Sequence, residues 1–197
     1  MRRVIPLAMF VGLALITAGC ARGREFTRPP SDALTLGTTT ETEVRQRMGE
    51  PRRKGTSMRN GVMITTLAYG YALAMPYVDD VKTRGMGFHF LNGVLVGYDF
   101  TSSFVEDKTR FDDSKVPQIE RGRSTRQDVV ALLGQPSGMY AHPLVKDKEA
   151  TGLVYLFVDT DRHPFASGVK HRRRLLIVTC DGQGVVTDVA YSTSEPN

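Results

Sequence analysis

Few side chains in this 197-residue chain could carry catalysis or bind a metal, and they are scattered. The four histidines fall into no recognised catalytic spacing; they are His89, His142, His163 and His171. The sequence has no Gly-x-Ser-x-Gly nucleophile elbow, no glycine-rich phosphate loop and no His-Glu-x-x-His zinc motif. It therefore predicts a protein that is not an enzyme, has no catalytic residue and uses no cofactor.

One segment places metal-capable side chains at alternate positions. Asp159, Asp161 and His163 would share one face if the segment formed a strand. Arg162 and Pro164 interrupt this pattern and indicate a strand that exits into a loop. We therefore predict no metal site, although a metal at this face is the alternative.

The densest charge cluster is the basic run Lys170-His171-Arg172-Arg173-Arg174. Such a run can bind anionic lipid headgroups, lipopolysaccharide phosphates, peptidoglycan carboxylates or an acidic protein, and it is the candidate partner-binding site. The alternative is a solvated strand whose cations prevent edge-to-edge aggregation. Nucleic acid is not an expected partner, because the formal charge of +5 falls to 24 − 21 = +3 once Arg2 and Arg3 are removed with a leader.

Cys20 stands at the end of an apolar N-terminal leader. Arg2 and Arg3 precede the apolar run 4–16, which is too short to span a bilayer and is typical of a cleaved signal peptide, here residues 1–19. The sequence Ile16-Thr17-Ala18-Gly19-Cys20 resembles the bacterial lipobox, whose cysteine is acylated, with palmitate among its acyl chains, and becomes the new N-terminus. The alternative is a plain signal peptide followed by a chance cysteine.

The residues after Cys20 suggest the destination. Ala21 follows the cysteine, and the absence of Asp there resembles lipoproteins sorted to the outer membrane of Gram-negative bacteria. We expect acyl chains on Cys20 to hold the protein on that membrane, facing the periplasm. Cys180 then has no partner for an intramolecular disulfide, and the apolar run 175–180 predicts that it is a small buried side chain.

The elements that position these residues are organised around a motif that occurs twice, at a constant offset of 122 − 37 = 85. Thr40 and Thr125 are expected to cap two short helices, with Glu43 and Asp128 completing capping boxes. A glycine and then a proline end each helix, and Val44 with Met48, or Val129 with Leu133, form its buried face. The repeated fold-motif residues are Gly37, Thr40, Val44, Gly49, Pro51, Gly122, Thr125, Val129, Gly134 and Pro136.

Strand patterns follow each helix. Residues 52–55 are expected to form a basic turn, 62–73 a strand, 75–85 a loop, and 86–100 a hairpin that turns at Asn92-Gly93. The pattern recurs at 153–158 and in a hairpin over 175–191, whereas the connection 159–174 is longer by five residues and is the expected place for a specific function. The fold class is therefore α+β, with two helix-plus-antiparallel-sheet repeats, each a short capped helix on a three- to four-stranded sheet.

The domain organisation follows. Residues 1–19 are expected to be a signal peptide, 20–33 a lipidated N-terminus and extended tether, 34–103 the first repeat, 104–118 a linker and 119–195 the second repeat.

These motifs resemble the SmpA/OmlA (BamE-like) family of outer-membrane lipoproteins, and two tandem copies look like the architecture of beta-lactamase-inhibitor protein. The chain departs from the family in lacking tryptophan, having Tyr69-Gly70-Tyr71 where the family strand offers Trp-x-Tyr. The resemblance implies a periplasmic binding or scaffold protein, an accessory of outer-membrane protein assembly or envelope integrity, with a protein partner in the outer membrane or periplasm. The alternative is an inhibitor-like module that binds a periplasmic enzyme through its loops.

Overall fold

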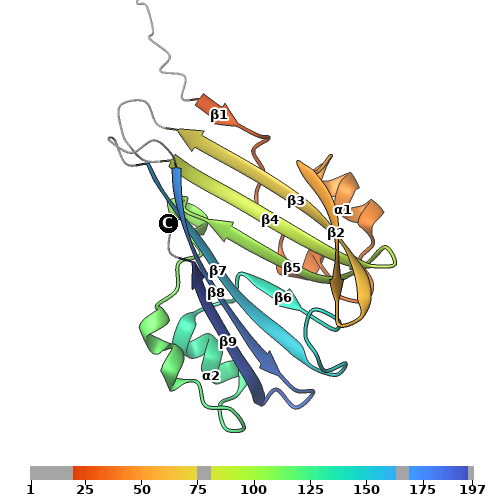
Figure 1. The fold of residues 1–197 in the computed structure, drawn as a ribbon, viewed down its shortest axis with the longest axis vertical. Coiled ribbons are helices and arrows are strands. Elements are labelled where there is room, and N and C mark those ends of the chain that lie inside the picture. Colours follow the sequence, from red (N-terminus) through yellow and green to blue (C-terminus); the bar gives the residue numbers. More distant parts are fainter. Residues whose placement is uncertain (1–19, 75–80, 163–168, 195–197) are drawn as a thin grey trace, which may run out of the picture.

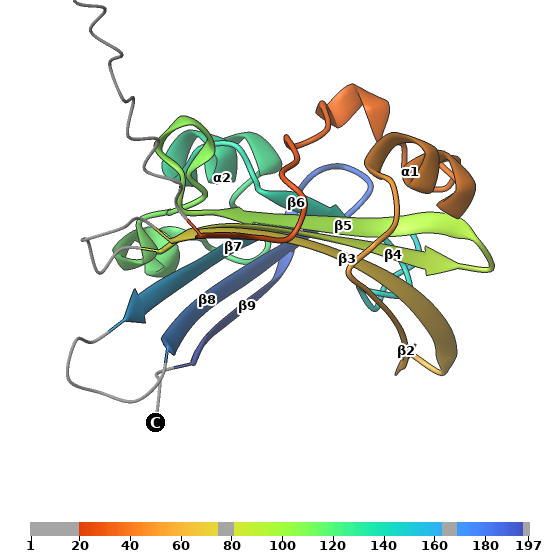
Figure 2. The same cartoon turned by 90° about the horizontal axis from the view of Figure 1, so that it is seen from above.

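The strands of the protein form one mainly antiparallel sheet, with two short α-helices on one of its faces (Figures 1 and 2). The computed structural model describes residues 20–74, 81–162 and 169–194. The strands are β1 (Cys20–Arg22), β2 (Arg53–Arg59), β3 (Val62–Ala74), β4 (Val81–Leu91), β5 (Val94–Ser102), β6 (Gly138–Tyr140), β7 (Thr151–Arg162), β8 (Val169–Cys180) and β9 (Val186–Ser194). The α-helices are α1 (Glu41–Met48) and α2 (Arg126–Leu133), and short 3-10 helices span Ser31–Ala33, Val105–Asp107 and Asp113–Gln118.

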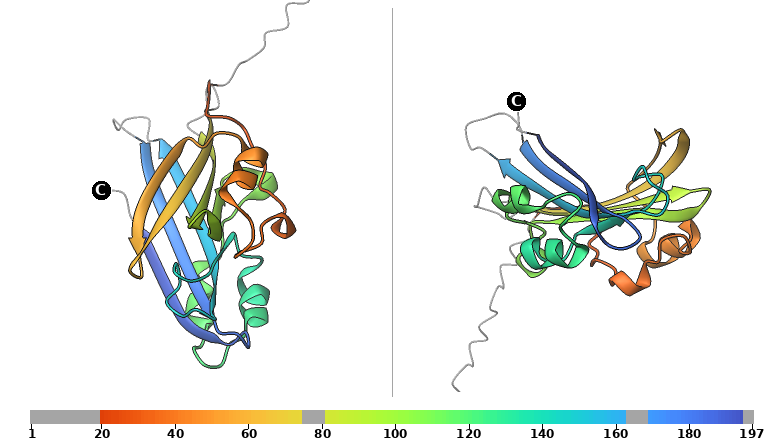
Figure 3. Two further views of the ribbon diagram at one scale, coloured as in Figure 1. Left: turned by 90° about the vertical axis from the view of Figure 1, so that its right-hand side faces the viewer. Right: turned by 90° about the horizontal axis from the view of Figure 1, so that it is seen from below.

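The order of strands in the sheet is β1-β3-β4-β5-β6-β7-β8-β9, and β2 also pairs with β3. The sequence predicted a three- to four-stranded sheet for each repeat, and in the structure the strands of both halves belong to one sheet. The joint is the three-residue strand β6, which pairs with β5 on one side and β7 on the other. The sheet is curved, so that the β2–β3 hairpin end forms one wing and β8 and β9 the other (Figure 3).

Both α-helices begin and end as their sequences predicted. The Thr40 backbone N–H donates to Glu43 Oε2 at 2.7 Å, and Thr40 Oγ1 accepts from the Glu43 N–H at 3.3 Å. Thr125 and Asp128 make the same two bonds at 2.8 and 3.2 Å. Gly49 ends α1 at φ 78° and ψ −158°, a region that is almost confined to glycine, and Gly134 ends α2 in the same way.

Each helix is fastened to the hairpin that follows it in its half of the chain. In the first half the Gly37 N–H donates to Leu95 O at 2.8 Å and the Glu41 N–H to Gly93 O at 2.9 Å. The second half repeats these bonds at 2.7 and 2.8 Å, with the donors Gly122 and Arg126 and the acceptors Val186 and Gly184. Such bonds explain how helices of only two turns, too short to be stable alone, keep their place on the sheet.

The helix-facing side of the sheet carries two apolar clusters. Val44 and Met48 of α1 pack on the first, and Val129 of α2 packs on the second together with Cys180, which is fully buried as predicted. Leu133, expected to be buried, is only partly buried but packs against the second cluster. The remaining buried members of the first cluster are Leu34, Leu67, Tyr69, Met86, Phe88, Phe90, Leu95, Tyr98 and Phe100, and those of the second are Phe111, Ile119, Leu153, Tyr155, Phe157, Leu176, Val178 and Val186.

A tyrosine of the sheet completes each helix end. Tyr69 of β3 donates its hydroxyl hydrogen to Gly49 O at 3.0 Å, and Tyr155 of β7 donates to Gly134 O at 2.9 Å. Burial raises the pKa of Tyr155 to about 12, so its hydroxyl stays protonated and remains a donor at any ordinary pH. These bonds satisfy carbonyl groups that a helix end leaves without a partner.

Two expectations about loops need correction. Residues 53–55, expected within a basic turn, belong to β2, which turns into β3 at Asn60-Gly61, where both residues have positive φ. Residues 81–85, expected in a loop, begin β4, and residues 75–80 lie outside the described residues. The expected linker 104–118 packs on the fold through Phe111, which is 6% exposed.

The expected tether 20–33 is also packed rather than extended from the fold. Cys20–Arg22 pair with β3 as strand β1, and Pro29 is buried. The Arg28 guanidinium donates to Pro136 O at 3.0 Å and lies 5.4 Å from the centre of the Phe100 ring. Residues 1–19, the expected signal peptide, lie outside the described residues.

The capping box of α2 leads to a pH-dependent prediction. Thr125→Ala should lower the free energy of unfolding by about 1 kcal/mol at neutral pH. Bonds from the Thr125 N–H and from the Thr125 hydroxyl lower the pKa of Asp128 in the folded state. The hydroxyl bond, which Thr125→Ala removes, is fully present above the unfolded pKa of about 3.9 and is lost as the pH falls through the lower folded value. Denaturant titrations from neutral pH to acid should therefore show the effect of Thr125→Ala shrinking. An undiminished effect in acid would contradict the role of the carboxylate.

Candidate interaction site

The basic run predicted as the partner-binding site lies in strand β8, not in a loop connection. Its register pairs Asp161 with Lys170 and Asp159 with Arg172, so acidic positions of β7 stand opposite basic positions of β8. Residues 163–168, including His163, lie outside the described residues, and so do the side chains of Lys170 and His171.

The three described arginines of the run point to two faces of the sheet. Arg172 and Arg174 alternate with Arg173, and Arg174 Nε lies 3.5 Å from Asp113 Oδ2 on the helix side. Arg173 is exposed on the opposite face. The three described arginines therefore do not form one continuous cationic patch.

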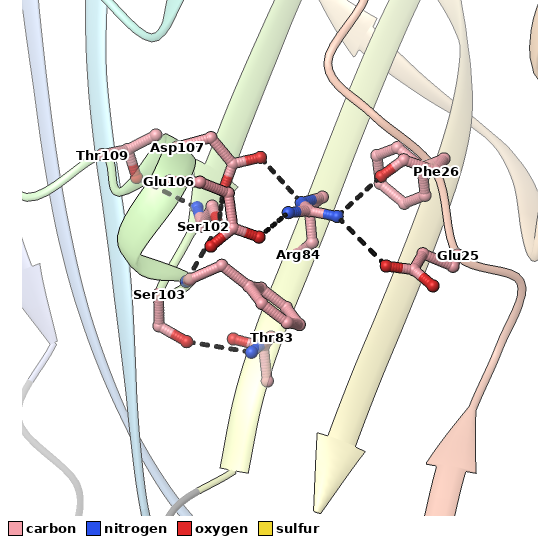
Figure 4. A network of polar contacts seen from close by, with 10 residues as sticks. Glu25, Phe26, Thr83, Arg84, Ser102, Ser103, Glu106, Asp107 and Thr109 are labelled. Carbon is pink, nitrogen blue, oxygen red and sulfur yellow. Dashed lines mark hydrogen bonds and ion pairs between the residues drawn. The ribbon is translucent and has the colours of Figure 1, made fainter.

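A buried arginine that the sequence analysis did not single out holds the first half together. Arg84 of β4 is 4% exposed, and its guanidinium lies 4.4 Å from the centre of the Phe104 ring. One terminal nitrogen donates to Phe26 O at 2.9 Å, and the other donates to Glu106 Oε1 at 3.0 Å (Figure 4). The N-terminal segment and the connection after β5 thus meet at one side chain.

Carboxylates balance the charge of Arg84. Its Nε lies 2.8 Å from Asp107 Oδ2 in an ion pair out of line for a hydrogen bond, and Glu25 Oε1 is 4.0 Å from a terminal nitrogen. Ser102 Oγ in turn donates to Asp107 and accepts from the Phe104 N–H at 3.1 Å. Burial of an arginine requires such partners, and here they come from segments on both sides of β4.

A second polar network lies on the sheet face opposite the helices. His89 Nδ1 is 3.0 Å from Thr66 Oγ1, and His89 Nε2 is 2.7 Å from Asp99 Oδ2. Tyr140 donates its hydroxyl hydrogen to the same Asp99 oxygen at 2.8 Å. The chain of bonds crosses β3, β4, β5 and β6, and His89 and Asp99 are only 16% and 17% exposed. We name Thr66, His89, Asp99 and Tyr140 the opposite-face network.

Glycines make room for this network. A Cβ on Gly87 would lie 3.2 Å from both Asp99 carboxylate oxygens. A Cβ on Gly97 would lie 2.7 Å from a Tyr140 ring carbon and 2.3 Å from Leu144 Cδ1. These two positions exclude larger residues because the side chains of the network and of the loop after β6 occupy the space.

The opposite-face network has the order hydroxyl, imidazole, carboxylate that nucleophilic catalysis uses, yet its setting favours a structural role. Thr66 lies inside β3, whose backbone is paired with β2 and β4, so it offers no free N–H groups to stabilise an oxyanion. Burial and the Asp99 carboxylate raise the pKa of Tyr140, which keeps its hydroxyl a donor. Among the described residues no three His, Cys, Asp or Glu side chains could together hold a metal ion.

Arginines surround the network on both wings of the sheet. Directly paired residues of antiparallel strands share a face, so Arg53 and Arg59 of β2 lie on the face of Thr66, and Arg173 of β8 lies on that of Tyr140. All three are exposed. Among the residues whose side chains the structure describes, these arginines place positive charge on this face in two groups, one on β2 and one on β8.

Sequence reasoning missed Arg84, Asp99 and Tyr140, and it left His89 without a role. A signal existed for His89, because it falls between Phe88 and Phe90 and must face away from the core that they occupy. Nothing in the local sequence brings His89 to Tyr140, which is 51 residues away (140 − 89 = 51). Burial raises the pKa of the Cys180 thiol, which supports its interpretation as an unreactive core residue.

The fold and these contacts define a mainly antiparallel sheet protein with few helices, whose buried polar side chains hold strands and connections together. No family model matches the chain, and no curated protein matches it. Its structure is similar to that of a candidate beta-lactamase inhibitor protein from Streptococcus mutans, with a TM-score of 0.40 and 10% identity over 78% of this chain and 82% of that chain. None of the described helices is long and apolar enough to cross a membrane.

Proposed function

We propose that the protein is a lipid-anchored, non-enzymatic binding or scaffold protein of the outer membrane that faces the periplasm. The observation that carries this proposal is the charged, apolar leader that ends in Ile16-Thr17-Ala18-Gly19-Cys20. Acyl chains on Cys20 would anchor the fold to the membrane, since several chains together bind a bilayer stably. The partner is a protein of the outer membrane or periplasm, with anionic lipid or peptidoglycan as further candidates for the basic residues.

Within this proposal, residues 34–103 and 119–195 are tandem SmpA/OmlA-like repeats of one ancestral unit. The support is the set of matched contacts at equivalent positions: two capping boxes, two helix-to-hairpin bond sets and two tyrosines that donate to helix-ending glycines. The repeated residues specify the fold. The function then lies where the copies differ, and β8 with its basic run is one such place.

Cys20→Ala tests the anchor. The variant should lose acylation and leave the outer-membrane fraction, appearing as unprocessed or soluble protein, because no other feature of the proposal holds it there. Membrane fractionation with metabolic labelling by palmitate measures both effects. If Cys20→Ala still fractionates with the outer membrane, the anchor proposal is wrong.

The alternative function is an inhibitor-like module that binds a periplasmic enzyme, and the exposed cations on the face opposite the helices favour it. Arg53, Arg59 and Arg173 would suit an acidic surface, because like charges reject basic partners and opposite charges speed association. Affinity purification from detergent-solubilised membranes distinguishes the two. Recovery with the outer-membrane assembly machinery supports the scaffold, whereas recovery with a soluble periplasmic hydrolase supports the inhibitor and contradicts the scaffold.

A further inference from the structure

No free tether separates Cys20 from the folded sheet. Cys20 pairs with Ala74, and the next two residues continue the pairing as strand β1. Gly23 then turns with φ 91° so close to β3 that a Cβ would lie 2.2 Å from the Gly70 carbonyl oxygen. A lipid on Cys20 would therefore leave the protein directly at the edge of the sheet.

The segment after β1 is fastened further along. Arg84 holds the Phe26 carbonyl at 2.9 Å and lies 4.0 Å from the Glu25 carboxylate. Phe26 packs against the first apolar cluster and makes an edge-to-face contact with the Tyr69 ring at 6.5 Å. Figure 4 shows the Arg84 contacts with Glu25 and Phe26. Together with the pairing of β1, they couple the position of Cys20 to that of the sheet.

The register of the sheet shows which other parts lie level with Cys20. Gly85 of β4 pairs with Thr101 of β5, and Thr101 Oγ1 accepts from the Val158 N–H of β7 at 3.0 Å, so these three positions form a row. Beyond the row β4 extends by 85 − 81 = 4 residues to Val81, and β7 extends by 162 − 158 = 4 residues to Arg162.

The ends of these two hairpins flank the Cys20 position. Val81 pairs with Ala74, the partner of Cys20, and Arg162 pairs with Val169, the first residue of β8. Figures 1 and 3 show the start of β1, the β3–β4 ends and the β7–β8 ends together at one end of the molecule. We name this the β1 end.

Side chains near the β1 end suit the surface of a bilayer. Val105, in the 3-10 helix that follows β5, is 86% exposed, which is unusual for an aliphatic residue. Arg22, two residues from Cys20 in strand β1, is also exposed. An exposed apolar side chain and an exposed cation at the same end of the molecule suit the headgroup layer, which accepts apolar contacts and attracts positive charge.

We propose that the β1 end faces the membrane, with β1, the Val105 helix and the β3–β4 and β7–β8 ends against the headgroups of the bilayer that holds the acyl chains of Cys20. This inference rests on the proposed function, because it requires Cys20 to be acylated. The strands then run away from the membrane, and the Asp181–Gly184 turn lies at the far end. The length of β8, 180 − 169 = 11 steps, separates that turn from the bilayer by about 36 Å.

The orientation divides the basic run. Lys170 is one residue from the level of Cys20, about 3 Å, whereas Arg173 is four residues away, about 13 Å. The potential of an anionic surface falls off over about 8 Å at physiological ionic strength. Positions 170 and 171 of the run therefore lie within reach of the lipid headgroups. Arg173 lies too far from the headgroups and is available to bind a protein partner.

Two variants, each with one added cysteine, test the orientation in the full, lipidated chain. Val105→Cys and Gln183→Cys place a fluorophore at the near and far ends, since both positions are exposed and the buried Cys180 does not react. The proteins are reconstituted into phosphatidylethanolamine and phosphatidylglycerol vesicles that carry a nitroxide quencher in the headgroup. We expect several-fold stronger quenching at position 105 than at position 183.

A spacer variant tests whether the docked segment sets the orientation. About twelve Gly/Ser residues inserted between Arg22 and Gly23 leave the residues next to Cys20 unchanged and add about 20 Å of flexible chain. Quenching at position 105 should fall toward that at position 183. The mass of the acylated residues 20–22 should stay the same, which controls for acylation. Unchanged quenching would mean that the docked segment does not fix the orientation. An unacylated Cys20 would overturn the proposed function together with this inference. Acylated protein with equal quenching at both positions would overturn this inference alone.

Discussion

Arg84→Met should lower the free energy of unfolding by about 3 kcal/mol, the effect expected when a buried charge loses its place in a network. Methionine fills much of the arginine volume, so the loss reflects charge and hydrogen bonds rather than a cavity. Asp107 would keep its carboxylate at 23% exposure without its cation, and the Phe26 carbonyl would lose its donor. Glu106 and Glu25 are each 67% exposed and can be solvated, which keeps the loss moderate.

Arg121→Met is the matched control for Arg84→Met. Arg121 also pairs with an aspartate, Asp188, at 2.7 Å, but both side chains are more than half exposed. Its loss should change the free energy of unfolding by no more than about 0.5 kcal/mol, since solvated ion pairs contribute little. Equal effects of the two substitutions in denaturant titrations would show that the Arg84 network does not stabilise the fold.

The sequence predicted elements whose signals are local. Thr40 with Glu43, and Thr125 with Asp128, fixed the helix starts because a capping box lies within four residues. Asn92-Gly93 predicted its hairpin for the same reason, and Asn60-Gly61 carried an equal signal at the β2–β3 turn that was overlooked. Strand β2 itself has exposed residues on both faces, so its sequence shows no alternation that could identify it.

The features that position the candidate sites depend on contacts between distant segments. Arg84 joins residues near 26 to residues near 106, and the opposite-face network joins Thr66 to Tyr140. The packed N-terminal segment has two prolines and several arginines, a composition typical of a tether, and only its pairing with β3 reveals a strand. The hydrophobic pattern of a segment does not predict which distant segment its polar residues will contact, because the pattern depends only on residues within that segment.

Gly138→Ala should break the joint between the two halves and lower the free energy of unfolding by about 3 kcal/mol. A Cβ on Gly138 of β6 would lie 2.2 Å from the Tyr98 carbonyl oxygen and 2.7 Å from Asp99 Cα, which are backbone atoms that no rotamer change can move. The β5–β6 pairing has only three residue pairs, so displacement of one of them affects the whole strand. Next to it, Ser137 N–H and Oγ donate to Val154 O, and Oγ also accepts from the Leu156 N–H.

Loss of the joint should also change how the molecule unfolds. Each half has its own apolar cluster and its own capped helix, so a weakened β6 would let the two halves unfold at different denaturant concentrations. Tyrosine fluorescence and circular dichroism should then give transitions that no longer coincide.

Gly55→Ala is the matched control. This glycine lies in strand β2 with nothing within 4 Å of a new Cβ, so the free energy of unfolding should stay the same or rise by up to about 1 kcal/mol. A single, coincident unfolding transition of Gly138→Ala with an unchanged midpoint would contradict the view that β6 joins two otherwise separate cores. The added methyl group would then have been accommodated at a position where the neighbouring backbone leaves no space for it.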